Sequence, residues 1–244
     1  MPRRVKLTLS YNGSRFAGLQ RQSHTDNTVI GTLEKVLRRL GIDADPVASG
    51  RTDAGVHAFR QVLHLDLPPH WDDLNKLRRA LEHQLPLSVR VRRIEWTADD
   101  FHARFDARRR VYRYLVTDRS ANPFEAELMT FSQTPLDLKR IDEAMRCFEG
   151  EHDFEYFKKT GSDVKHYVRT VYRAFAYRHR GVVVLYFEAN AYLRSQIRMM
   201  ADAVLKVNAG EMSLKELREQ IERRKRHTTD LAPAAGLYLS KVIY

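Results

Sequence analysis

The sequence has little that could cross-link the chain or cross a membrane. It contains one cysteine, Cys147, among 244 residues, which excludes an internal disulfide and a cysteine-rich zinc site. No apolar run approaches the ~18 residues that a membrane-spanning helix needs, and the N-terminal MPRRVKLTLS lacks the apolar core of a secretion signal. We therefore expect a cytoplasmic, soluble protein that does not act at a membrane.

Motifs of several common enzyme classes are also missing. The chain has no GxGxxG or Walker loop for nucleotide phosphates, no GxSxG elbow of an α/β-hydrolase and no HExxH zinc motif. The ten histidines form no ligand set, and His57 near Asp53 is more typical of a structural pair than of a metal site. The sequence thus gives no support for a nucleotide cofactor or a metal.

Acidic residues are the minority among the charged ones. The chain holds 42 Lys and Arg against 31 Asp and Glu, so its net charge is +11 and its isoelectric point is about 9.8. A charge of this size can simply keep a protein soluble. It is also the electrostatic signature of a protein that binds nucleic acid. Charge alone leaves both explanations open, while 43% hydrophobic residues are enough for a real core.

Hydrophobic periodicity predicts two similar α/β halves. In the first half, alternating and helical patterns predict β, α, β, β, α and β elements at residues 5–9, 28–40, near 47, 63–67, 72–85 and 89–96. In the second half the same order recurs, with one extra helix, at residues 110–117, 138–148, 167–177, 182–189, 192–208, from 213 onward and 237–244. This order is that of ferredoxin-like units. We predict an α/β (α+β) protein with domains 1–103 and 104–244.

The loop GRTDAGVHA at residues 50–58 lies between two predicted strands. Asp53-Ala-Gly55 is ordinary turn chemistry, so the loop could be only a turn. Glycines also let a ligand approach the backbone closely, and the nearby guanidinium of Arg51 would favour an ionised Asp53. An ionised carboxylate suits a nucleophile or a base.

Arginines and aromatic rings alternate along residues 101–114, which hold five of the former and four of the latter. Arginine binds phosphates, and rings stack on unpaired bases at ~1–3 kcal/mol per base. The same pattern fits an edge strand with Tyr112 and Tyr114 in the core, and both readings stay open. Farther along, Arg194 and Arg198 are spaced to share one face of the helix predicted over 192–208.

At the 50–58 loop the sequence resembles the signature of the tRNA pseudouridine synthase A family. Other segments agree with the family in the same order along nearly the whole chain. They are Tyr11-Asn-Gly13 with Phe16, Gly18, Gln20, Gln22 and Thr28-Val29; Gln61-Val62 and His64; Phe101, Ala103-Arg104, Ala107, Arg110 and Tyr112-Arg-Tyr114; Gly150, His152-Asp-Phe154, Phe157 and Arg169-Thr170; and Ala232-Pro-Ala234 with Gly236-Leu237 and Leu239.

The resemblance implies an isomerase that converts uridine to pseudouridine at positions 38, 39 and 40 of the tRNA anticodon stem-loop, without a cofactor. It implies a homodimer that binds one tRNA across both subunits. It also implies the pseudouridine synthase fold, in which two ferredoxin-like halves share a mainly antiparallel sheet with a basic catalytic cleft between them. A non-catalytic RNA-binding protein on the same fold, or a synthase for other uridines, is the alternative.

The resemblance also assigns roles to individual residues. Asp53 would be the catalytic aspartate, and Arg51 would pair with it or take the place of the flipped base. Tyr112 would stack on the uracil, and Arg110 of the same motif would contribute to substrate binding. Arg198 would form a salt bridge to Asp53, with Arg194 as the other candidate for this basic position. Whether Asp53 attacks C1′ or removes a proton from C2′ is left open by the sequence.

Overall fold

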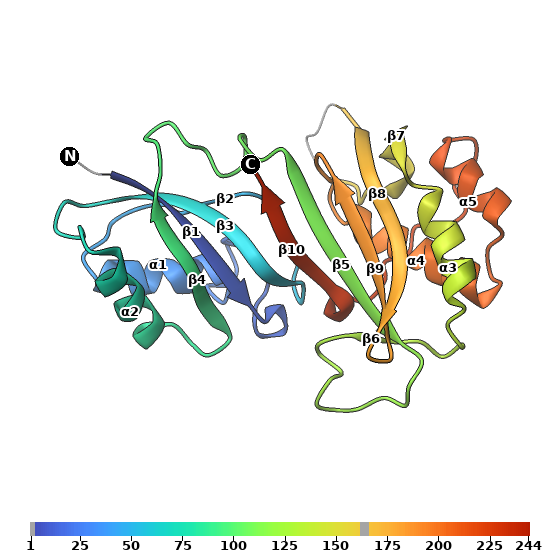
Figure 1. Ribbon diagram of the computed structural model, residues 1–244, viewed down its shortest axis with the longest axis horizontal. Helices are drawn as coiled ribbons and strands as arrows, with labels where there is room; N and C mark the ends of the chain where they lie inside the picture. The colour runs from blue at the N-terminus through green and yellow to red at the C-terminus, as the bar shows by residue number, and fades with distance from the viewer. Residues whose placement is uncertain (1–2, 162–165) are drawn as a thin grey trace. The chain divides into compact units, whose positions relative to one another are not determined.

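The computed structural model describes residues 3–161 and 166–244, and the chain forms two compact units (Figure 1). The first unit extends to Arg108 and includes Tyr238–Tyr244, and the second is Arg109–Leu237. The mixed α/β class predicted from the sequence is confirmed. The final strand, expected in the second half, belongs by its contacts to the first unit; the domain ranges 1–103 and 104–244 stay a prediction.

The first unit has the predicted βαββαβ order. Its elements are β1 (Arg3–Tyr11), α1 (Val29–Arg39), β2 (Val47–Ala48), β3 (His57–Leu67), α2 (Leu74–Gln84) and β4 (Val89–Trp96), with β10 (Leu237–Ile243) added from the end of the chain. The sheet order is β4-β1-β3-β10, and β2 pairs with β3. All these pairs are antiparallel except β3 with β10. Helix α2 packs against β4 and beside α1 (Figure 1).

Alternation along β1 separates a buried face of this sheet from a polar one. Val5, Leu7 and Leu9 are fully buried, and Lys6 and Thr8 between them are half-buried. Both helices begin at side chains that cap their first turn, as Thr28 accepts from the Gly31 N–H and Asp73 from Asn75 and Lys76. The caps and the apolar stripes explain why the sequence predicted these helices within two residues.

His64 lies on the polar face of β3 but is 5% exposed. Its Nδ1 accepts the Ala103 N–H at 3.0 Å, and burial, followed by the charge of Arg4, lowers the pKa of His64 below the usual 6.5. As the pH falls, the unfolded chain therefore binds a proton at His64 at a higher pH than the folded chain does.

We expect the free energy of unfolding to fall as the pH drops from 7 to 5. The variant His64→Asn, which keeps a hydrogen-bond acceptor, should flatten the slope of this free energy against pH in urea titrations. An unchanged slope would contradict a neutral His64.

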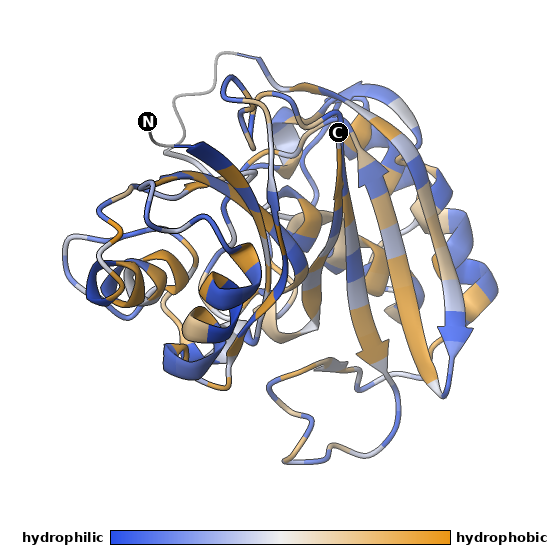
Figure 2. Ribbon diagram, turned by 60° about the vertical axis from the view of Figure 1, so that its left-hand side comes forward, coloured by the Kyte–Doolittle hydropathy of each residue, from blue (hydrophilic) through white to orange (hydrophobic). Residues whose placement is uncertain are grey.

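The second unit is built on a sheet in the order β5-β9-β8-β7, with β6 parallel to β5. Its strands are β5 (Arg109–Thr117), β6 (Thr130–Phe131), β7 (Gly150–Asp153), β8 (Val168–His179) and β9 (Val182–Ala189). Its helices are α3 (Leu138–Arg146), α4 (Gln196–Ala209) and α5 (Leu214–Ile221). Helix α3 packs on β8 and beside α4. Strand β9 is mainly hydrophobic, orange in Figure 2, and supplies the centre of this core.

Two predictions for the second unit need correction. The helix expected over 192–208 begins only at Gln196. Ser195 has a left-handed backbone conformation with φ of 58°, which interrupts helical geometry before that point. The Leu193 N–H is bound by the Gln196 side chain, which accepts it. Arg194 therefore precedes the helix and does not share a helical face with Arg198. The helix predicted from residue 213 onward is confirmed as the 8-residue α5, which starts at a complete capping box formed by Ser213 and Glu216.

None of the helices in the described parts of the chain is both long and apolar enough to span a membrane.

Candidate functional site

The segment 49–56 between β2 and β3 is fixed by hydrogen bonds at both ends. Ser49 Oγ bonds to the Gln61 side chain at 2.7 Å, and Gln61 Nε2 donates to the Gly50 carbonyl. At the other end of the segment, the Asp53 carbonyl accepts the Val56 N–H and closes a turn. Gln61 is fully buried in β3, so a rigid strand sets the position of the loop.

Thr52 anchors the centre of this loop. Its hydroxyl bonds to the Tyr11 hydroxyl at 2.7 Å, and its carbonyl accepts the Leu19 N–H. Burial raises the pKa of Tyr11 to about 12, so the tyrosine remains neutral and the bond persists at physiological pH. The residue directly before Asp53 is thus held from β1 and from the segment that precedes α1.

Two glycines allow the 13–19 segment to approach the loop. A Cβ added at Gly13 would lie 2.0 Å from the Val56 carbonyl oxygen, and one at Gly18, where φ is 116°, would lie 3.1 Å from the Thr52 carbonyl oxygen. Neither atom is the end of a flexible side chain. These positions therefore require glycine, which gives a physical reason for the Gly13 and Gly18 matches noted in the sequence.

Gly13→Ala is expected to destabilise the protein by about 1–3 kcal/mol, since the new methyl group must displace the backbone at Val56. Turnover is expected to fall about a hundredfold, because displacement by 1 Å at a reacting group has effects of that size. Gly50→Ala is the matched control, because Gly50 lies in the loop that Gly13 contacts and a Cβ added there meets nothing within 4 Å. Thermal unfolding and activity of both variants test the prediction; equal activities would contradict it.

Asp53 and Arg51 lie on either side of Thr52 and differ in exposure. Asp53 is half-buried, whereas Arg51 is exposed. Arg51 forms no ion pair within the parts of the chain that are described, so the expected pairing of Arg51 with Asp53 is not seen. The other expected role of Arg51, occupying the place of a flipped base, suits an exposed guanidinium.

His57 has a structural role, as expected. It is 1% exposed, its Nδ1 accepts the Gly13 N–H at 3.0 Å, and its ring stacks on Tyr238 with centroids 4.5 Å apart. It therefore ties the end of the 50–58 loop to the glycine segment and to β10. Among the described residues, no group of three or more His, Cys, Asp or Glu side chains is arranged to hold a metal.

The other candidates lie in the second unit, where Arg110, Tyr112 and Tyr114 share one face of β5. Each pairs with a residue on the same face of β9, Arg110 with Ala189, Tyr112 with Phe187 and Tyr114 with Leu185. Arg110 Nη1 donates to the Asn190 carbonyl at 2.8 Å. Tyr114 is completely buried, while Tyr112 is 8% exposed. Of the two readings of this stretch, the core reading holds for Tyr114.

Tyr192 supports Tyr112 and was not predicted. The two rings meet edge to face, 5.3 Å apart at 85°. Burial raises the pKa of Tyr192 well above its usual value, and its hydroxyl meets no hydrogen-bond partner in the described chain. The contact fixes the orientation of the Tyr112 ring. No sequence signal pointed to it, since the residues are 80 positions apart and Tyr192 was assigned to a helix.

Arg198 occupies the first turn of α4. Its Nε donates to the Ala232 carbonyl at 2.7 Å, and the Ala232 N–H donates back to the Arg198 carbonyl. Burial raises the pKa of Tyr114, while the hydrogen bond with Thr130 and the positive charge of Arg198 oppose this effect. The Tyr114 hydroxyl in turn contacts Thr130 and the Pro233 carbonyl. Arg198 is thus held in a defined orientation by the 232–233 segment.

Arg194 is placed differently. It is exposed, and its Nη1 donates to the carbonyls of Thr160 and Gly161, each at 3.4 Å. The structure therefore brings Arg198, and not Arg194, beside Tyr114 and the 232–233 segment. In chemical terms, the first unit presents a half-buried carboxylate on a rigid loop. The second presents an oriented aromatic ring with two fixed guanidinium groups.

Comparison with known proteins points to one family. The model of a family described as tRNA pseudouridine synthase matches residues 8–106 and 144–244, which include both the 50–58 loop and the Arg198 segment.

Similar proteins of nearly the same length carry one name, "tRNA pseudouridine synthase A". The protein of Wolinella succinogenes is 40% identical over 236 residues, covering 97% of this chain and 92% of its own. That of Campylobacter jejuni is 38% identical and covers 99% of both chains. The protein of Lactococcus lactis is 36% identical over 247 residues, covering 99% of this chain and 97% of its own.

Proposed function

Since the chain belongs to the tRNA pseudouridine synthase family and is an isomerase acting on tRNA uridine, we propose that its targets are uridines 38, 39 and 40 of the anticodon stem-loop. The observation that carries this proposal is the 50–58 loop, where Asp53 is held between Thr52 and the turn to Val56. The nine-residue match of this loop to the family signature is the most specific one in the chain.

The reaction breaks the bond from ribose C1′ to N1 of the uracil, turns the ring and forms a bond from C1′ to C5. The proton on C5 is released and N1 gains one, so no oxidant, reductant or energy source is needed. We propose that Asp53 is the catalytic residue, attacking C1′ or removing the C2′ proton. Both routes require an ionised carboxylate.

The remaining candidate residues bind the substrate in this proposal. Tyr112 stacks on the uracil while the ring is detached, with Tyr192 behind it at 5.3 Å. Arg198 pairs with Asp53; the anchoring of Arg198 to Ala232, in contrast to the surface position of Arg194, supports this choice. Arg110, whose guanidinium donates to the Asn190 carbonyl, contributes to the substrate-binding face. Arg51, exposed beside Asp53, enters the RNA helix in place of the flipped uridine.

The partners and location follow from the same family. We propose that the protein binds the anticodon arm of tRNA as a homodimer in the cytoplasm, with no resident cofactor. Extracting a base from its helix costs a few kcal/mol, and stacking on an oriented ring offsets a cost of that size. The +11 charge supports binding to a polyanion.

Unmodified tRNA transcripts incubated with the purified protein test the choice of uridines. Carbodiimide mapping should show pseudouridine only at positions 38, 39 and 40, and transcripts with cytidine at these positions should gain none. Modification at other uridines would overturn the positions while leaving the reaction intact. Tight binding without modification would favour a non-catalytic RNA-binding protein.

A further inference from the structure

Arg169, the second residue of β8, is a partly buried cation without a counter-charge. Burial lowers the pKa of its guanidinium, and no charged group of the described chain opposes this effect. Within residues 3–161 and 166–244, no carboxylate forms an ion pair with it. Other arginines on strands differ, since Arg4 pairs with Asp66 and Arg109 pairs with Glu188.

The hydrogen bonds of Arg169 use one of the three guanidinium nitrogens. Nη1 donates to the carbonyls of His166 and Val168, at 3.0 and 2.6 Å. Nε is buried, and neither it nor Nη2 meets an acceptor in the described parts of the chain. An unpaired buried donor destabilises the fold. Nε and Nη2 together form the edge of an arginine that binds two oxygens of one phosphate in parallel.

The strand register places Arg169 on the sheet face that carries Tyr112. Arg110 pairs with Ala189, and Ala189 pairs with Val171, so these three lie in a row across β5, β9 and β8. Arg169 precedes Val171 by two residues, and Tyr112 follows Arg110 by two, which keeps all of them on one face. Arg169 and Tyr112 are therefore ~10 Å apart across the sheet and ~13 Å apart along it, a separation that a few nucleotides of one RNA strand cover.

Asn190 joins the start of β8 to the elements that hold the substrate-binding residues. Its Oδ1 accepts the N–H of Thr170 and the N–H of Ala191, at 3.1 and 2.7 Å. Its own N–H donates to the Thr170 carbonyl, and its carbonyl accepts Nη1 of Arg110. The start of β8 is thus fixed relative to Arg110 and to the segment that leads to Tyr192.

We propose that Arg169 binds a phosphate of the anticodon arm, a few nucleotides from the uridine that stacks on Tyr112. The inference rests on the proposed function, which supplies both the RNA and the stacked uridine. A phosphate brings the negative charge and the acceptors that Nε and Nη2 need, and the contact positions the RNA strand without reading its sequence. Arg169 contacts no reacting atom, so its contribution is to binding.

A purely structural role is the alternative. The two bonds from Nη1 hold the first residue of β8 and the segment before it. That role uses neither Nε nor Nη2 and does not depend on the positive charge. It predicts that removal of the charge lowers stability and leaves the salt dependence of RNA binding unchanged. A carboxylate from a second protein molecule would also suit the guanidinium, and its loss would change the oligomeric state.

The first test measures binding of full-length tRNA at several salt concentrations by wild type, Arg169→Gln and Arg169→Lys. Arg169→Gln should weaken binding about tenfold and reduce the slope of log K against log salt by about 1, the value for one lost phosphate contact. Arg169→Lys keeps the charge and should keep the slope, with a smaller loss of affinity because an ammonium group cannot form the fork. An unchanged slope for Arg169→Gln, or altered sedimentation with unchanged RNA binding, would overturn the proposal.

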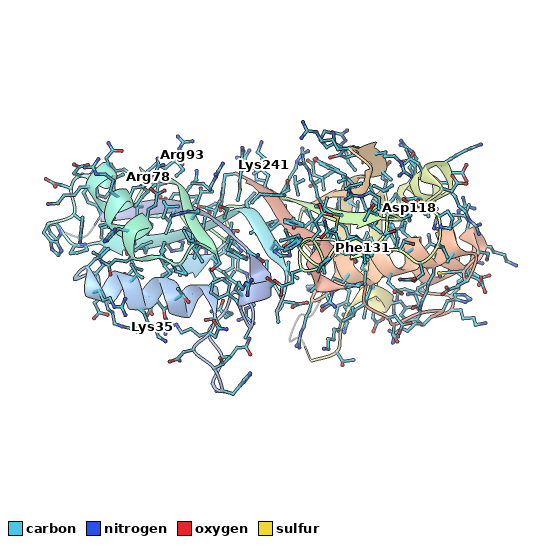
Figure 3. All side chains as sticks on the ribbon, turned by 90° about the horizontal axis from the view of Figure 1, so that it is seen from below. Lys35, Arg78, Arg93, Asp118, Phe131 and Lys241 are labelled. Atoms are coloured by element: carbon cyan, nitrogen blue, oxygen red, sulfur yellow. The ribbon has the colours of Figure 1, made fainter. Side chains whose placement is uncertain are left out.

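Arg178→Gln is the matched control on the same strand. Arg178 also donates to a main-chain carbonyl, that of Leu136, but it lies near the arrowhead of β8, whereas Arg169 lies at its start (Figure 1). Arg178 has a counter-charge in Asp118, which follows β5 next to β6; Asp118 and Phe131 of β6 are labelled in Figure 3. This control should bind tRNA with the affinity and salt slope of wild type. Equal changes in both glutamine variants would contradict a specific contact at Arg169.

The second test locates the phosphate. Synthetic anticodon stem-loops each carry one uncharged methylphosphonate in place of one phosphate. The affinity of wild type should fall at one or two adjacent positions near the target uridines, and Arg169→Gln should lose nothing further at those positions. Equal sensitivity of the two proteins at every position would overturn the proposal. Failure of the proposed function would appear separately, as absence of pseudouridine at positions 38, 39 and 40 after incubation with wild type.

Discussion

Asp53→Asn is expected to abolish pseudouridine formation while leaving the affinity for tRNA within about tenfold of wild type. The amide has nearly the shape of the carboxylate but can neither attack C1′ nor accept the C2′ proton. The hydrogen bonds that fix the loop come from Thr52 and from the Asp53 backbone, so the variant should fold normally. Release of tritium from tRNA labelled at uridine C5 measures turnover, and filter binding measures affinity.

Asp43→Asn is the matched control, because Asp43 is an exposed carboxylate of the same unit outside the loop. It should release tritium at the wild-type rate. Asp53→Ala should behave like Asp53→Asn. Measurable turnover by either Asp53 variant would reject the catalytic assignment.

Variants of Tyr112 are expected to distinguish the contribution of the aromatic ring from that of the hydroxyl group. Tyr112→Phe keeps a stacking surface and should retain most of the activity. Tyr112→Ala should lose turnover and also about 3–5 kcal/mol of stability, since the ring is 8% exposed and packs against Tyr192. The lost stability would by itself make that result ambiguous.

Tyr112→Leu resolves the ambiguity. Leucine fills most of the space next to Tyr192 but offers no aromatic face, so the protein should remain folded in thermal unfolding. Its kcat/KM should fall about tenfold to a hundredfold, the equivalent of one lost stacking interaction. Equal turnover of Tyr112→Phe and Tyr112→Leu would show that the ring is not a stacking platform.

The parts of the fold that local patterns determine could be predicted from the sequence. The alternation of Val5, Leu7 and Leu9 gave β1, and the Ser213–Glu216 capping box gave the start of α5. Other features depend on distant contacts. The two-residue β6 and four-residue β7 are too short for a periodic signal, and the parallel pairing of β10 with β3 joins segments about 180 residues apart.

The candidate site was predictable to a similar extent. The Asp53 loop is contiguous in sequence, so one motif identified it. The supports of that loop are scattered: Tyr11 and Gly13 contact it from β1 and the following segment, and nothing local shows that Gly13 touches Val56. The hydrophobic periodicity predicted that α4 starts before Ser195, because a single residue in the left-handed conformation does not change the hydrophobic pattern. That error placed Arg194 beside Arg198.

We infer that this chain rearranges uridine in tRNA with its own carboxylate as the sole reactive group. A single-turnover experiment tests it most directly, with dialysed protein in excess over tRNA labelled with tritium at uridine C5 and nothing else added. We expect release of up to one tritium for each target uridine, matched by pseudouridine in the recovered RNA. Retention of all tritium by a tRNA that the protein binds would contradict it.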